Sequence, residues 1–182
     1  MEKALKLLGY RVTGGNWVRD PEVARVALDR ALTLVPQYDA FQDNPWPMLY
    51  KEMDMAFPGS KFILTLRDPQ KWVASVAKNF GTDVTPMREW IYGKGRGFPK
   101  GNEEAYVECF ERHNREVLEY FGDRRQNLLV MNVTEGEGWD KLCPFLDLAI
   151  PEMPFPKANV RLEKGWKGRL NKIRSWAARK SV

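Results

Sequence analysis

An arginine and a serine lie where the chain is expected to pass from a strand into a helix. Arg67 follows the apolar run 61–66 and precedes Asp68-Pro69, a pair typical of a helix start. Helix N-termini at the carboxyl ends of parallel strands bind anions. Arg67 would add a fork of donors there, and Ser75, two turns into the helix, would add a hydroxyl. Spacing leaves two interpretations open: an anion site, or an ion pair of Arg67 with Asp68 or Asp43.

A second candidate is Asp43, which lies just past the short strand expected over residues 38–41. Its carboxylate could act as a general base toward a hydroxyl if burial or neighbours raise its pKa. Spacing alone favours the alternative, in which Asp43 or Asn44 caps a helix that starts at residues 45–47. His113 is the single histidine, and its place on the apolar flank of a helix favours a core role over a site role.

Around these residues, the hydrophobic pattern predicts an α/β domain in which parallel strands alternate with helices in three layers. The runs 61–66 and 127–133 are almost continuously apolar, as expected of parallel strands covered on both faces. Two further short strands are expected, at 10–13 and 38–41. Helices are expected near the N-terminus up to Gly9, from Asp20-Pro21 onward, and over 47–56, 69–80, 102–121, 139–148 and 167–180.

Composition and charge limit the class of protein. With 182 residues and 43% hydrophobic residues, the chain can bury one core, so we expect a single domain over 1–182. Residues 157–182 hold nine Lys/Arg against Glu163. We interpret them as containing a basic amphipathic helix with a solvated face, anion binding being the alternative. Neither a membrane span nor a secretory signal is visible, which predicts a soluble, cytoplasmic protein.

Several other chemistries find no support. Cys109 and Cys143 lack metal-ligand spacing, so we expect buried thiols and no metal. The absence of GxxxxGK[ST] argues against ATP-driven kinase chemistry. The glycine-rich stretch 93–101 does not join a strand to a helix, and we expect a mobile loop that serves as a substrate lid. Trp166 and Trp176 fit an apolar helix face better than a base-stacking surface, so no nucleic-acid partner is expected.

Several segments together resemble the sulfotransferases that use 3′-phosphoadenosine 5′-phosphosulfate (PAPS). They are Asp43-Asn-Pro-Trp-Pro, Phe57-Pro-Gly-Ser-Lys-Phe-Ile-Leu-Thr-Leu-Arg-Asp-Pro with Trp72 and Ser75, and Gly138-Trp-Asp-Lys-Leu-Cys-Pro-Phe-Leu146 with Phe155-Pro. The resemblance is to a bacterial and fungal branch and extends to about residue 159. It implies a three-layer fold of the P-loop nucleoside triphosphate hydrolase-like type. It also implies sulfuryl transfer from PAPS to a hydroxyl or amine of a small-molecule or glycan acceptor.

The resemblance assigns roles by position. Arg67 and Ser75 match the family residues that hold the 3′-phosphate of PAPS. Asp43 falls where related sulfotransferases place a catalytic base, commonly a histidine. Lys164 and Lys167 lie in a basic, glycine-containing segment that resembles the one closing over the 3′-phosphate in cytosolic relatives.

The start of the chain departs from this family. Family members begin with a strand and a glycine-rich loop that wraps the 5′-phosphosulfate, immediately before the helix that opens this chain. Met1 stands where that loop should already have ended. The first strand and phosphate loop are therefore expected to be missing, either by truncation or because this is a shortened relative. The alternative function is then a non-catalytic, degenerate binding module. Uncovered sheet edges also lead us to expect marginal stability or self-association.

Overall fold

The computed structural model describes residues 1–156, in which helices alternate with short parallel strands. The strands are β1 (Val12–Gly14), β2 (Ala40–Gln42), β3 (Phe62–Thr65) and β4 (Leu128–Met131). The α-helices are α1 (Glu2–Leu7), α2 (Val23–Leu34), α3 (Tyr50–Ala56), α4 (Pro69–Phe80), α5 (Pro86–Tyr92), α6 (Glu103–Phe121) and α7 (Trp139–Phe145). Short 3₁₀ helices are η1 (Val35–Gln37), η2 (Trp46–Leu49) and η3 (Val133–Glu135). The basic helix expected over 167–180, with Lys164 and Lys167 before or within it, lies outside the described residues.

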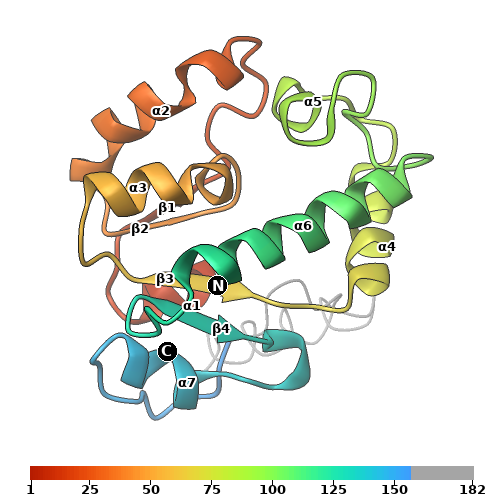
Figure 1. Ribbon diagram of the computed structural model, residues 1–182. Coiled ribbons are helices and arrows are strands. Elements are labelled where there is room, and N and C mark those ends of the chain that lie inside the picture. The colour runs from red at the N-terminus through yellow and green to blue at the C-terminus, as the bar shows by residue number, and fades with distance from the viewer. Residues whose placement is uncertain (157–182) are drawn as a thin grey trace, which may run out of the picture.

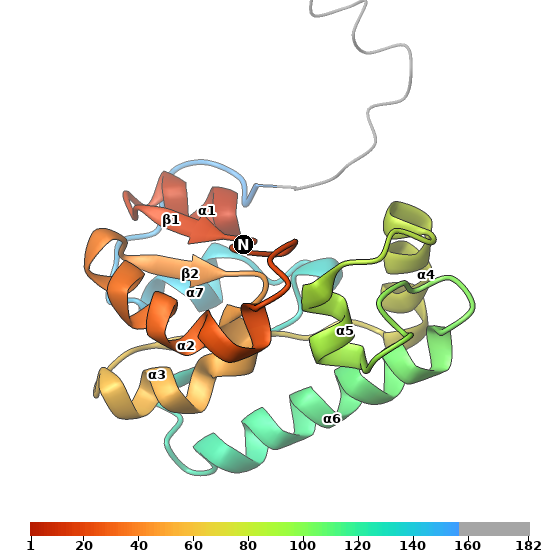
Figure 2. The same cartoon turned by 90° about the horizontal axis from the view of Figure 1, so that it is seen from above.

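The four strands form two parallel pairs. β1 pairs with β2, with Val12 opposite Ala40, and β3 pairs with β4, with Phe62 opposite Leu128. Figures 1 and 2 show the strands running in one direction, with the β1–β2 pair above the β3–β4 pair in Figure 1. The predicted α/β class with parallel strands is therefore confirmed. Within residues 1–156, however, β2 and β3 are not hydrogen-bonded to each other, so there are two small sheets rather than one.

Helices cover both faces of these strands. Ile63 and Leu129 pack against the buried cluster of α1 and α7, whereas Leu64 packs against α3 and α6. This alternation follows from the period of two along a strand. Around β1 and β2, Figure 2 shows α1 on one side and α2 and α3 on the other. The coverage is incomplete, because Leu64 is the only buried residue of β3 and Thr65 is exposed. The expectation that this strand is covered throughout was wrong.

Side-chain packing joins the two halves. Phe62 of β3 contacts the core cluster of α2, η2 and α5 as well as the cluster of α3 and α6. Its ring lies 4.9 Å from that of Phe121, which in turn lies 6.3 Å from Tyr50 of α3. Aromatic contacts thus make the core continuous between the two strand pairs, although no strand ladder joins β2 to β3 within residues 1–156.

Ion pairs fasten the amino ends of the strands. Arg11, just before β1, donates from its backbone amide, Nε and Nη2 to the carboxylate of Asp39, just before β2. These hydrogen bonds lower the pKa of Asp39 to about 2. Lys61, just before β3, donates to the carbonyl oxygen of Phe145 at 2.7 Å and to the carboxylate of Asp147.

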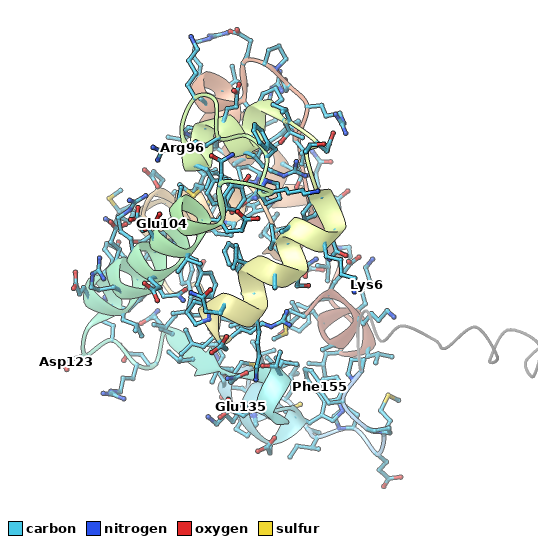
Figure 3. The ribbon with its side chains drawn as sticks, turned by 90° about the vertical axis from the view of Figure 1, so that its right-hand side faces the viewer. Lys6, Arg96, Glu104, Asp123, Glu135 and Phe155 are labelled. Atoms are coloured by element: carbon cyan, nitrogen blue, oxygen red, sulfur yellow. The ribbon has the colours of Figure 1, made fainter. Side chains whose placement is uncertain are left out.

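Some elements differ from the sequence prediction. The helix α5 was not predicted, although Thr85 and Pro86 start it with a side-chain cap and a first-turn proline. The stretch 93–101 is a loop, as predicted, but Gly97 and Pro99 within it are buried. The amide of Lys100 also donates to the carbonyl of Gly81 at 3.1 Å, which ties this loop to the end of α4. In Figure 3 the label Arg96 marks this loop, above the label Glu104 at the start of α6 (green).

Within residues 1–156, the edge of β3 that faces away from β4 is not paired with another strand. The amides of Phe62 and Leu66 donate toward β4, to Asn127 and Met131. In a parallel ladder, the alternate residues Ile63 and Thr65 then point their amides and carbonyls to the opposite side. Neither residue has a backbone hydrogen bond on that side within residues 1–156. Such an edge is a template for pairing with another chain.

We therefore propose that the chain self-associates through this edge, and the variant Thr65→Pro tests it. Proline removes an amide hydrogen that the β3–β4 ladder does not use, but it blocks addition of a further strand. Sedimentation velocity over a concentration series should show association for the parent chain and a shift toward monomer for the variant. The conservative variant Thr65→Ser should associate like the parent. A parent chain that stays monomeric at all concentrations would contradict the proposal.

Candidate functional site

Three loops follow the carboxyl ends of the strands, two from the β1–β2 pair and one from the β3–β4 pair. They are 15–17 after β1, 43–45 after β2 and 66–68 after β3. The first two are in contact, since the amide of Asn16 donates to the carbonyl of Asn44 at 3.1 Å, and the strand ends before them are equally close, because a Cβ on Gly14 would lie 2.2 Å from the carbonyl oxygen of Gln42. The start of α1 reaches the same edge, where Gln42 Nε2 donates to Glu2 Oε2 at 3.4 Å. The fold therefore collects polar residues where a parallel sheet binds ligands.

Arg67 is positioned by the end of β3 and the start of α4. It is partly buried, and within residues 1–156 its guanidinium takes part in no hydrogen bond or ion pair. The alternative of an ion pair with Asp68 or Asp43 is therefore not observed in this part of the chain. A guanidinium that lacks a carboxylate partner remains able to bind an anionic ligand with its five donors.

The start of α4 is built as the sequence predicted. Asp68 is the N-cap, and its Oδ1 accepts from the amide of Lys71 at 2.7 Å, with Pro69 in the first position. The amide of Gln70 has no partner within the described residues. This helix end therefore offers one free amide beside Arg67, while the Asp68 carboxylate already occupies another.

Ser75 lies on α4, six residues after Pro69, which places it roughly 9 Å further along the helix axis. Its side chain is partly buried and forms no hydrogen bond within residues 1–156. Trp72, one turn earlier, stacks on Phe110 of α6 at a centroid separation of 4.5 Å. Trp72 is thus a packing residue, as expected, and it fixes the orientation of the helix that carries Ser75.

Asp43 lies at the end of β2 with an exposed side chain and a left-handed backbone, φ +55°. Its Oδ2 accepts from Gln42 Nε2 at 3.2 Å. The helix-cap alternative for Asp43 or Asn44 was wrong, because η2 has Pro45 as its N-cap and neither η2 nor α3 has a side-chain cap. The carboxylate is therefore available at the strand ends and is not used to start a helix.

The remaining candidates lie away from this edge. His113 on α6 is partly buried, its ring meets that of Tyr50 edge-on at 5.8 Å, and burial lowers its pKa. This environment fits the core role. Cys109 and Cys143 are buried free thiols, and burial raises the pKa of each. Within residues 1–156 there is no group of three or more His, Cys, Asp or Glu that could hold a metal ion.

Sequence analysis missed Asn16, which belongs to this site. Its side chain accepts from Trp46 Nε1 at 2.9 Å, and its amide donates to the carbonyl of Asn44 at 3.1 Å. Gly14-Gly15, directly after the strand expected at 10–13, is a turn signal in the sequence. A polar residue directly after such a turn at a strand end was the signal that could have identified it.

Comparison with known proteins gives the class to which this chain belongs. The sulfotransferase domain family matches residues 1–94 and 84–163. The chain therefore belongs to the sulfotransferase domain family. A curated relative, the "Ava biosynthesis cluster protein M" of Aspergillus versicolor, is 27% identical over 175 residues, which cover 79% of this chain. The chain spans 65% of the length of that relative. No helix among residues 1–156 is long and apolar enough to cross a membrane.

The N-cap at the site can be tested by Asp68→Ala. Loss of the bond to the Lys71 amide should lower the free energy of unfolding by about 1 kcal/mol. Asp68→Asn keeps a side-chain oxygen acceptor and should retain most of the stability. Urea unfolding followed by circular dichroism measures both variants. Equal stability of Asp68→Ala and the parent would show that this bond does not stabilise α4.

Proposed function

We propose that this chain binds PAPS and transfers its sulfuryl group to a hydroxyl or amine of a small-molecule or glycan acceptor. Arg67 and Ser75 hold the 3′-phosphate, and Asp43 takes the proton from the acceptor. Lys164 and Lys167 add contacts to the 3′-phosphate. The proposal includes a single domain over residues 1–182, a P-loop-like three-layer fold, and a cytoplasmic location.

One observation carries the proposal: the guanidinium of Arg67 at the exit of β3 has no hydrogen bond or ion pair to any described residue, in a chain of the sulfotransferase domain family. A phosphate dianion is well matched by an Arg fork with a hydroxyl and a helix amide nearby. Arg67, Ser75 and the amide of Gln70, which has no partner within residues 1–156, supply groups of these types on one strand–helix unit. The two parallel strand pairs between helical layers support the fold in the proposal.

When bound, PAPS supplies an activated sulfuryl group on a phosphate leaving group. The residues of the chain orient the donor and accept the acceptor's proton. Asp43 suits the second task, because its carboxylate is exposed at the carboxyl edge of β2 and hydrogen-bonded only to Gln42 among the described residues. An acceptor hydroxyl approaching this edge would meet a free carboxylate oxygen.

Binding of adenosine 3′,5′-bisphosphate, measured by titration calorimetry, tests the 3′-phosphate site. Arg67→Ala should weaken binding by roughly 10- to 100-fold, since a charge-assisted hydrogen bond contributes about 1.5–3 kcal/mol. Ser75→Ala should weaken it less. Lys78→Ala, which removes an exposed cation from the last turn of α4, is the matched control and should bind like the parent. Absence of binding, or affinity that is indifferent to Arg67, would remove the basis of the proposal.

Transfer of labelled sulfate from PAPS to a panel of hydroxyl and amine acceptors separates the enzyme from a non-catalytic binding module. In an active chain, Asp43→Asn should lower kcat by about 10²- to 10⁴-fold, the usual contribution of a general base. Binding of adenosine 3′,5′-bisphosphate should be unchanged in this variant. Nucleotide binding without transfer to any acceptor would instead favour the binding module.

A further inference from the structure

The loop that carries Asp43 has a conformation that its own sequence does not enforce. Asp43 has φ +55°, a left-handed backbone that a non-glycine residue adopts only at a conformational cost. The exposed carboxylate has one side-chain partner within residues 1–156, Gln42 Nε2 at 3.2 Å. The direction of the carboxylate is therefore set by the backbone of the loop, and contacts to that backbone decide where it points.

Those contacts converge on Asn16, in the loop after β1. The amide of Asn16 donates to the carbonyl of Asn44 at 3.1 Å, directly after Asp43. Asn16 Oδ1 accepts from Trp46 Nε1 at 2.9 Å, and Asn16 Nδ2 donates to Thr13 Oγ1 at 3.3 Å. One side chain and its amide thus connect the end of β1 to positions on the far side of Asp43.

Trp46 makes this connection rigid. Its side chain is only 6% exposed and lies in the core cluster with residues of α2 and α5. Its ring packs 4.2 Å from that of Phe41, and its backbone amide donates to the carbonyl of Asp43 at 3.0 Å. A buried indole N–H without a hydrogen-bond acceptor destabilises the folded state, because it has lost its bond to water. The acceptor that Asn16 provides therefore stabilises the buried position of Trp46.

We propose that Asn16 is a positioning residue for Asp43: it holds the 43–46 loop so that the Asp43 carboxylate is presented at the strand ends. This inference rests on the proposed function for its catalytic consequence. The conformational claim, that Asn16 maintains the backbone of the loop around Asp43, does not depend on the proposed function. It extends the site from β2 and β3 to the loop after β1, because the side chain of Asn16 links the two loops.

The test uses NMR of the full chain with labelled Asp43. A positive φ is reported by the one-bond Cα–Hα coupling and by a strong amide–Hα nuclear Overhauser effect within the residue. Both signals should be lost in Asn16→Ala and in Trp46→Phe, which removes the indole N–H but keeps an aromatic ring at this position. Asn16→Asp retains the acceptor for Trp46 and the backbone amide, so it should keep the left-handed signals and serve as the conservative rescue.

Asn127→Ala is the matched control. Asn127 is another partly buried asparagine that joins two segments, donating from Nδ2 to the carbonyl of Ser60 at 3.2 Å, but at the amino end of β3 and β4. Its replacement should leave the Asp43 signals unchanged. Left-handed signals at Asp43 that persist in both Asn16→Ala and Trp46→Phe would overturn the proposal.

Kinetics separate the two proposals. In a chain that transfers sulfate, Asn16→Ala should lower kcat at least 10-fold with little change in the binding of adenosine 3′,5′-bisphosphate. The double variant with Asp43→Asn should be no slower than Asp43→Asn alone, because both changes act through one group. Fully additive losses would contradict the positioning role. Full activity of Asp43→Asn would instead refute the base assignment and leave the conformational result standing.

Discussion

Within residues 1–156 no strand ladder joins β2 to β3, so the contact between the two strand pairs rests mainly on side-chain packing. Phe62 provides this packing from β3 by reaching both core clusters, and Phe121 and Tyr50 extend the aromatic contacts into α6 and α3. Parallel strands are rarely stable unless both faces are covered. The short strand pairs therefore need the helices that cover them, and the position of the site residues depends on the same helices.

The two proposed roles of the site fall on different halves. Arg67 follows β3 of the β3–β4 pair, whereas Asn16 and Asp43 follow the strands of the β1–β2 pair. In a continuous sheet, the ladder would fix the distance between such groups to within the spacing of strands. In this chain, the packing of the aromatic core around Phe62 sets the distance between these groups. A change in packing at Phe62 could therefore alter the relation between the cation and the carboxylate without touching either.

The sequence was most informative where one signal dominated locally. The continuous apolar run before Arg67 and the Asp68-Pro69 start placed β3 and α4 almost to the residue, and the apolar period placed α6. It was least informative where the structure depends on long-range pairing. The two strand pairs, the incomplete cover of β3 and the role of Asn16 depend on neighbours far along the chain, which periodicity does not report. The capping hypothesis for Asp43 failed for a related reason, because a polar residue before a proline looks the same whether or not its side chain meets a helix amide.

Of the ion pairs at the amino ends of the strands, the one between Arg11 and Asp39 depends on pH in a defined way. Because the pKa of Asp39 is lowered to about 2 by Arg11, this pair adds stability above the ordinary titration range of a carboxylate and loses it only as the pH falls toward 2. Lys61 fastens β3 to the end of α7 in the same region. The strands are thus fastened at their amino ends. The loops of Asn16, Asp43 and Arg67 follow the opposite, carboxyl ends, so the residues of the proposed site lie away from these ion pairs.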